Sequence, residues 1–257
     1  MSLIVRDLRI GFGDRTVVDV DEMQVGDGEI VGLVGESGSG KSITSLAIIG
    51  LARSTGAWVE GSIELDGREL TTLEEPAWRA LRGDRIAMIF QSPVSSLNPV
   101  FRVGDPFVRA LRLHGATKAE ARDRAARAMR EVVLSPDLLH RYPHQLSGGQ
   151  AQRVAIAMAV ALRARVLLAD EPTSALDVTV QAEILELIQR MRREEGISVL
   201  FVSHDLAVVS GLCDRVAIMQ SGQIVETGPT GETLRVPTHP YTQQLVAAVP
   251  RLGDAHA

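Results

Sequence analysis

At 257 residues, with 45% hydrophobic and 23% charged content, the chain is long enough to bury one large core, or a core with a subdomain. Its formal net charge of −5 argues against a nucleic-acid-binding protein, which normally presents a basic face. No run reaches the ~18 apolar residues that span a bilayer, and the single cysteine, Cys213, excludes an internal disulfide, so we expect a reduced, cytoplasmic protein.

The N-terminal part predicts antiparallel strands. Residues 3–5 and 16–18 belong to short alternating runs separated by Gly and Asp turns, and residues 62–70 repeat this pattern around an Asp66-Gly67 turn. Between them, residues 30–34 predict a buried strand and residues 43–49 predict a helix.

The segment that joins this strand to this helix matches the phosphate-binding pattern G-x-x-x-x-G-K-[ST] in full. Glycines let the backbone curl so that several N–H groups point at one spot, and the helix N-terminus faces the same spot. The alternative is a Gly/Ser-rich turn that matches by chance. The residues predicted to hold a nucleoside triphosphate are Gly35, Glu36, Ser37, Gly38, Ser39, Gly40, Lys41 and Ser42, with the Ser42 hydroxyl as a Mg²⁺ ligand.

A strand at residues 86–90 ends at Gln91, whose amide is placed to touch both a metal ion and an attacking water. From about residue 100 to 140 the apolar residues follow a helical period, which predicts a mostly helical insert. The basic run from Arg122 to Arg130 lies within it. We interpret this run as the solvated face of a helix, because Ala121, Ala125, Ala128 and Met129 line the other side.

Residues 146–150, Leu-Ser-Gly-Gly-Gln, predict a second helix start suited to an anion. Ser147 is a good N-cap, and the two glycines leave the N-terminal amides open. Such a site is redundant if one chain forms a whole nucleotide site. It makes sense if two chains meet head to tail and each offers this helix to the other, although a simple capped helix is the alternative.

Strand–helix alternation resumes after the insert and predicts a mainly parallel α/β sheet. The apolar residues 166–169 precede Asp170, placed to hold Mg²⁺, and Glu171, placed to polarise the water that attacks the γ-phosphate. An acidic cap before Pro172 is the alternative. His204 follows the strand at residues 198–202 and is positioned to donate to the γ-phosphate; residues 216–219 and 223–226 should pair across a turn.

The chain resembles ATP-binding cassette (ABC) ATPases over nearly its whole length. The resemblance is carried by residues that occur in the order, and at roughly the separations, of that family: 35–42, 91, 146–150, 170–171, 174–177 and 204. The resemblance implies a P-loop NTPase (RecA-like) α/β core with an antiparallel β subdomain and a helical insert. It implies ATP and Mg²⁺ as cofactors. It also implies that the γ-phosphate of the ATP held by a partner subunit is bound by Ser147, Gly148, Gly149 and Gln150 of this chain. By the same likeness Asp177 lies at the dimer seam, and Phe12 takes the place of an aromatic ring, often tyrosine, that stacks on adenine.

The expected organisation has four segments. Residues 1–92 form the first part of the core with the β subdomain, and residues 93–156 form the helical subdomain with the signature segment. Residues 157–235 form the second part of the core, and residues 236–257 form a tail whose residues 241–249 suit a docking helix.

Residues 88–99, 142–145 and 239–242 resemble the branch of the family that takes up peptides and nickel. Membership of that branch implies three kinds of partner: a second ABC ATPase subunit, two transmembrane permeases and, indirectly, an extracytoplasmic solute-binding protein. It implies that this subunit lies at the cytoplasmic face of the membrane and binds no nucleic acid. Longer members carry a cysteine-rich extension for an iron–sulfur cluster; those cysteines are lacking here, so we expect no cluster.

We therefore expect the ATP-hydrolysing subunit of an importer of peptides or nickel-type solutes, in a homodimer or a heterodimer. One alternative is an exporter ATPase. Another is a soluble ABC ATPase of DNA repair or translation, which usually brings coiled coils, zinc cysteines or tandem cassettes. A third is a regulatory module without turnover, against which Glu171 and His204 weigh.

Overall fold

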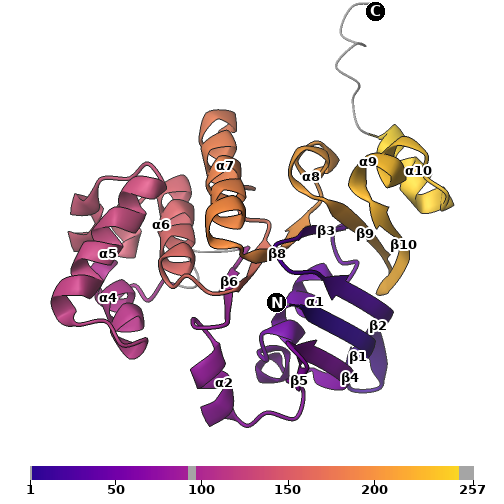
Figure 1. Ribbon diagram of the computed structural model, residues 1–257, viewed down its shortest axis with the longest axis horizontal. Coiled ribbons are helices and arrows are strands. Elements are labelled where there is room, and N and C mark those ends of the chain that lie inside the picture. The colour runs from indigo at the N-terminus through magenta and orange to yellow at the C-terminus, as the bar shows by residue number, and fades with distance from the viewer. Residues whose placement is uncertain (1, 92–96, 249–257) are drawn as a thin grey trace, which may run out of the picture. The chain divides into compact units, whose positions relative to one another are not determined.

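A computed structural model describes residues 2–91 and 97–248 of the chain (Figure 1). It contains two compact units. The first comprises Met1–Leu73 with Val199–Ala257, and the second comprises Glu74–Ser198. The predicted four-segment organisation refers to family subdomains rather than to these units, and it stays a prediction.

The first unit contains a four-stranded antiparallel sheet with the order β2-β1-β4-β5. Its strands are β1 (Leu3–Phe12), β2 (Arg15–Val25), β4 (Trp58–Leu65) and β5 (Arg68–Glu69). Leu3, Val5, Leu8 and Ile10 of β1 are fully buried, as expected for a strand with one face on the core. The predicted antiparallel strands are confirmed, and β1 and β2 are longer than the apolar runs that indicated them.

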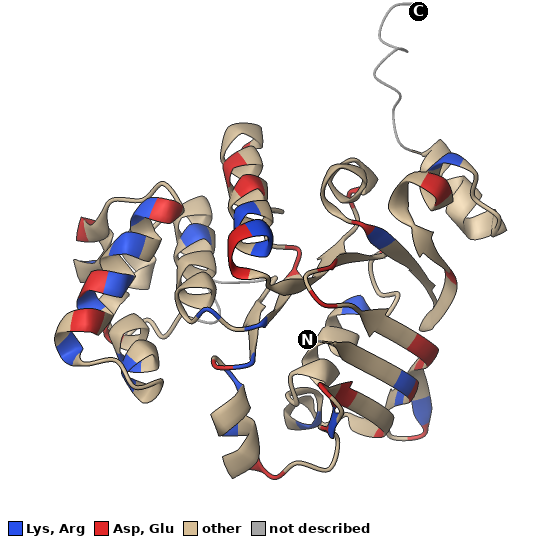
Figure 2. Ribbon diagram, in the orientation of Figure 1, with Lys and Arg blue, Asp and Glu red and all other residues tan. Residues whose placement is uncertain are grey.

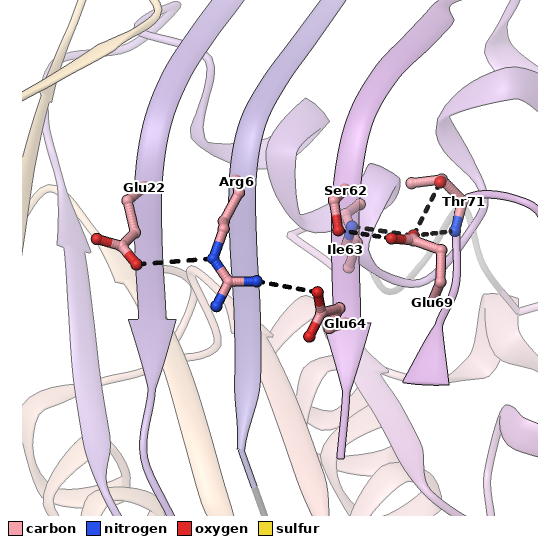
Figure 3. A network of polar contacts seen from close by, with 7 residues as sticks. All are labelled: Arg6, Glu22, Ser62, Ile63, Glu64, Glu69 and Thr71. Atoms are coloured by element: carbon pink, nitrogen blue, oxygen red, sulfur yellow. Dashed lines mark hydrogen bonds and ion pairs between the residues drawn. The ribbon is translucent and has the colours of Figure 1, made fainter. Parts of the chain in front are cut away.

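Polar contacts tie the strands of this sheet together on its other face (Figure 3). The guanidinium of Arg6 on β1 pairs with Glu64 on β4 at 2.9 Å and approaches Glu22 on β2 at 3.9 Å. The carboxylate of Glu69 accepts hydrogen bonds from Ser62, Ile63 and Thr71. Burial alone would raise the pKa of Glu69, but these hydrogen bonds outweigh it and lower the pKa to about 2.

The first unit also holds a parallel arrangement of strands. β3 (Ile30–Val34) pairs in parallel with β8 (Ser198–Ser203) and with β9 (Arg215–Gln220), and β10 (Gln223–Pro229) pairs antiparallel with β9. All five residues of β3 are buried. The helices of this unit are α1 (Lys41–Ile48), η1 (Ala52–Thr55), α8 (Leu206–Leu212), α9 (Thr230–Arg235) and α10 (Pro240–Ala247).

Cys213 packs as an apolar residue inside this unit. It is 8% exposed, and its Sγ lies 3.1 Å from the position that a Cβ on Gly32 of β3 would occupy. Burial, with a smaller contribution from the neighbouring Asp214 carboxylate, raises the pKa of the thiol to about 12. The thiolate, which is the reactive form of cysteine, is therefore suppressed at neutral pH.

The second unit combines two parallel strands with a group of helices. β6 (Ile86–Ile89) pairs in parallel with β7 (Val166–Asp170). The helices are α2 (Glu75–Leu81), α4 (Gly104–Leu113), α5 (Lys118–Glu131), η2 (Pro136–His140), η3 (Pro143–Gln145), α6 (Gly148–Ala161) and α7 (Val178–Glu195). The predicted helical character of residues 100–140 is confirmed, whereas residues 92–96 of the branch-specific stretch lie outside the described residues.

Helix α5 shows why the basic run has a structural explanation. A Thr117–Glu120 capping box starts the helix, and blue and red segments are interspersed along its ribbon in Figure 2. Ala121, Ala125 and Met129 are fully buried on the opposite side. The run is thus the solvated face of an amphipathic helix, as predicted. In the part of the chain that the structure describes, no helix is both long and apolar enough to traverse a membrane.

Candidate functional site

The loop between β3 and α1 depends on glycine at two positions. A Cβ on Gly35 would lie 2.1 Å from the carbonyl oxygen of Met219, which no packing adjustment of a side chain relieves. Gly40 has φ 110°, and its Cβ would lie 2.9 Å from the side chains of both Val18 and Met219. The predicted phosphate loop is thus folded tightly against β2 and β9, and only glycine allows that curl.

Lys41 places its charge inside this loop. The side chain is 5% exposed, and its Nζ donates to the carbonyl oxygens of Gly35 at 2.7 Å and Glu36 at 2.8 Å. Ser42 follows in the first turn of α1 and is partly exposed. A curled loop, an ammonium group and a helix N-terminus meet here, and this combination fits the phosphates of a nucleotide.

The register of the parallel strands places His204 at the same sheet edge. Ser203, the last residue of β8, pairs with Val34, the last residue of β3. The next residues along the two strands, His204 and Gly35, therefore emerge together at the carboxyl end, where open α/β sheets bind ligands. His204 is exposed, whereas Asp205 is engaged as the N-cap of α8.

Two further predicted residues meet in the second unit. Ile89 of β6 pairs with Ala169 of β7, so Gln91 and Glu171 follow the same edge. The Gln91 Nε2 donates to the Glu171 Oε2 at 3.1 Å. Glu171 has φ 45°, a left-handed conformation that costs energy for a non-glycine residue and that occurs often at functional sites. Asp170, just before it, ends β7 and is 3% exposed.

The start of α6 is built as the sequence predicts. The Ser147 Oγ accepts from the Gln150 N–H at 3.2 Å, and the Gln150 Oε1 accepts from the Ser147 N–H at 3.0 Å, which forms a capping box. Gly148 is exposed, and a Cβ added to it would meet nothing within 4 Å. The backbone at Gly148 is therefore open to approach from outside the chain.

Asp177 starts α7, and Phe12 ends β1. Asp177 caps α7 by accepting from the Val180 N–H at 3.0 Å. Phe12 ends β1 with 41% of its surface exposed, on the β1–β2 hairpin whose Val18 contacts the phosphate loop. Both positions are compatible with the roles that the resemblance implies, and those roles stay predictions.

Sequence reasoning missed two polar residues that hold the site loops. The Tyr241 hydroxyl of α10 accepts from the Glu36 N–H at 2.9 Å. The fully buried Gln152 of α6 donates through Nε2 to the carbonyl oxygen of Pro172, directly after Glu171, at 2.7 Å. Gln152 stands out in the sequence only as a polar residue inside an apolar helix. Tyr241 belongs to residues 239–242, which resemble one branch of the family, but the sequence did not indicate its contact with Glu36.

The donor chemistry at the predicted metal ligands suits Mg²⁺. Ser42, Gln91 and Asp170 offer hydroxyl, amide and carboxylate oxygens, which this hard cation prefers. Among the residues described, no group of three or more His, Cys, Asp or Glu side chains gathers as a metal site.

Comparisons with known proteins identify the family of the chain. Residues 18–174 match the family model described as ABC transporter. The dipeptide transport ATP-binding protein DppD of Haemophilus influenzae is 46% identical over 263 residues, covering 99% of this chain and 79% of that protein. The glutathione import ATP-binding protein GsiA of Salmonella typhimurium is 50% identical over 235 residues, covering 88% of this chain and 38% of that protein.

Solved structures give the same fold. A dimeric ATP-binding cassette in a post-hydrolysis state, bound to ADP and Pi, is 28% identical with a TM-score of 0.81 and covers 90% of this chain and 99% of that chain. A further structure, of an ATP-binding subunit of an ABC transporter, is 29% identical with a TM-score of 0.78. The predicted fold class and the predicted ATPase activity are therefore confirmed. This chain belongs to the ABC transporter family and is one of its ATP-binding, ATP-hydrolysing cassettes.

Proposed function

We propose that this cassette drives a peptide importer from the cytoplasmic face of the membrane, together with a second cassette and two permeases. The observation that carries the proposal is the 46% identity, over 99% of the chain, to a dipeptide transport ATP-binding protein. A putative peptide import protein of Brucella melitensis, 47% identical over 98% of the chain, supports it. These names favour peptides over nickel-type solutes, and import over export.

Within one chain, each site residue then has a role in hydrolysis. The amides of residues 35–42 and the Lys41 ammonium hold the outer phosphates, and Ser42 and Asp170 hold Mg²⁺ with Gln91. The bound ion would neutralise charge on the phosphates. Glu171 orients and deprotonates the attacking water, His204 donates to the γ-phosphate, and Phe12 stacks on the adenine.

A second cassette completes the site. The exposed start of α6, with Ser147, Gly148, Gly149 and Gln150, binds the γ-phosphate held by the partner, and Asp177 lies at the seam between the two chains. The open space around Gly148 supports this role, because a phosphate oxygen can approach the backbone closely only where no side chain intervenes. Closure of the two cassettes on ATP drives the permeases, and hydrolysis reopens them.

Substitution of Glu171 tests the hydrolytic assignment. Glu171→Gln keeps the shape and the hydrogen-bonding capacity toward Gln91 but cannot take up a proton. We expect MgATP binding to persist, phosphate release to fall by ~100-fold or more, and a stable ATP-bound dimer to accumulate, measured by light scattering and a phosphate-release assay. Full turnover in this variant refutes the role of Glu171.

Lys41→Ala is the matched contrast, because it removes the phosphate-binding charge and leaves the water-activating group in place. It should weaken nucleotide binding itself, so no dimer should be trapped.

Transport of peptide is tested in vesicles that contain the cassette pair and their permeases. ATP is supplied on the side of the membrane where the cassettes lie, and a labelled dipeptide is delivered by the binding protein on the other side. We expect the ATP to drive transport of the dipeptide to the cassette side. Uptake of Ni²⁺ with no uptake of peptide, or transport in the opposite direction, would contradict the proposal.

A further inference from the structure

The C-terminal helix α10 brings a tyrosine hydroxyl to the phosphate loop. Tyr241 is 5% exposed, and its Oη accepts a hydrogen bond from the backbone N–H of Glu36 at 2.9 Å. Glu36 is the second residue of the phosphate-binding pattern and lies 205 positions earlier in the chain. Both residues belong to the first compact unit, so this contact lies within one body.

The bond to Tyr241 holds a residue that Lys41 also holds. The Glu36 carbonyl oxygen accepts from the Lys41 Nζ at 2.8 Å, so the N–H and the C=O of Glu36 are both engaged. The three N–H groups of the Lys41 ammonium contact the carbonyl oxygens of Gly35 and Glu36 and, at 3.4 Å, the Ser39 Oγ, so binding a phosphate exchanges at least one of these contacts. The Tyr241 bond requires no such exchange, and it can restrain the loop before and after nucleotide binding.

The helix that carries Tyr241 is itself fixed at its start. His239 caps α10, with its Nδ1 accepting from the Tyr241 N–H at 3.2 Å. Glu226 on β10 accepts from the Thr238 N–H at 2.9 Å and from the His239 N–H at 3.0 Å. Burial acts to raise the pKa of Glu226, but hydrogen bonds from residues 238–242 outweigh it and lower the pKa to about 2. Glu226 is therefore a charged acceptor throughout the physiological pH range.

We propose that Tyr241 is a positioning residue for nucleotide binding, which holds the first turn of the phosphate loop in its binding-competent form. A loop that is already ordered loses less conformational freedom when it takes up a ligand, so its affinity is higher. The inference rests on the proposed role of residues 35–42 in holding phosphates. It adds the C-terminal segment of residues 226–248 to the elements that set nucleotide affinity.

Tyr241→Phe tests this directly, because it removes the hydroxyl and keeps the ring in its buried place. We expect the dissociation constant for MgATP to rise ~2- to 10-fold, the usual effect of losing one hydrogen bond. We also expect kcat in the assembled transporter to stay unchanged while KM for ATP rises. Hydrogen exchange at the Glu36 amide, followed without nucleotide, should become faster.

Two further variants complete the experiment. Tyr142→Phe removes the hydroxyl of the other tyrosine of the chain, and it should alter neither the affinity nor the exchange rate. Glu226→Gln loosens the start of α10 without touching the loop. It should raise the dissociation constant in the same direction as Tyr241→Phe, by a smaller factor.

The outcomes separate this inference from the proposed function. If Lys41→Ala weakens MgATP binding and Tyr241→Phe does not, the phosphate loop is assigned correctly and the role of Tyr241 is overturned. If Lys41→Ala binds MgATP as tightly as the unaltered chain, both the assignment of the phosphate loop and the role of Tyr241 are overturned. A Tyr241→Phe protein that melts at lower temperature, yet binds ATP normally well below that temperature, shows a purely structural tyrosine and overturns the inference.

Discussion

Glu171 occupies a backbone conformation that few residues other than glycine adopt, with φ 45°. Its carboxylate accepts a hydrogen bond from the Gln91 amide at 3.1 Å. The sequence indicated both residues, because each follows a predicted strand. The strained backbone of Glu171 and its bond to Gln91 could not be predicted, since they depend on the pairing of two strands that lie about eighty residues apart.

Gln91 offers a test at this scale. Gln91→Ala removes the amide that restrains Glu171 and leaves the carboxylate in place. We expect kcat for ATP hydrolysis to fall ~10- to 100-fold, because misplacing a water-activating group is costly, while the dissociation constant for ATP changes little. Steady-state kinetics and equilibrium binding of MgATP measure the two quantities.

Gln189→Ala is the control for this variant. Gln189 lies on α7, where its Oε1 accepts a hydrogen bond from the Arg193 guanidinium at 3.3 Å. Its removal should leave both quantities unchanged. A Gln91→Ala enzyme as fast as the Gln189→Ala control would show that the Gln91–Glu171 contact has no part in turnover.

At the scale of elements, local patterns predicted most strands and helices correctly. β1 was underestimated, because Asp7 and Gly11 interrupt its apolar alternation and resemble turn signals, whereas the structure keeps the strand running through a register shift between Arg6 and Arg9. A bulge of this kind satisfies an interrupted pattern without ending the strand. Pairing with two neighbouring strands supplies what the local pattern lacks.

The Glu69 network gives a prediction for the antiparallel sheet. The pKa of Glu69 is lowered in the fold, so between about pH 4.5 and pH 2 the unfolded chain binds more protons at this residue than the folded chain does. The stabilisation is thus present above the unfolded pKa and is lost as the pH falls through this window. Denaturant unfolding of the intact chain at a series of pH values measures it.

Glu69→Gln should flatten this part of the pH dependence. Glu22→Gln removes a more exposed carboxylate, whose contact with Arg6 is long, at 3.9 Å, and exposed ion pairs contribute at most ~1 kcal/mol. It should leave the pH dependence nearly as it is. Parallel curves for the unaltered chain and Glu69→Gln between pH 4.5 and pH 2 would be inconsistent with the network.

At the scale of the whole molecule, the order and spacing of short motifs were enough to predict the family and the fold class. Those motifs are local, and each one combines a strand end or a helix start with a few polar residues. The contact of Tyr241 with the phosphate loop joins residues 205 positions apart. No local pattern indicates such a contact, because it arises only when β10 and α10 return to the loop in the folded chain.

In the proposed function, a single cassette holds only part of each working site. The test is the rate of ATP hydrolysis per chain, measured as the concentration of a second cassette (another copy or the paired subunit) is raised. It is measured for the unaltered chain and for Ser147→Ala. Ser135→Ala, which removes the comparable cap of η2, is the control for lost helix capping. We predict that the rate rises with second-cassette concentration and collapses in Ser147→Ala alone, with ATP binding retained. A monomer that hydrolyses ATP at a full, concentration-independent rate, with Ser147→Ala as active as Ser135→Ala, would contradict it.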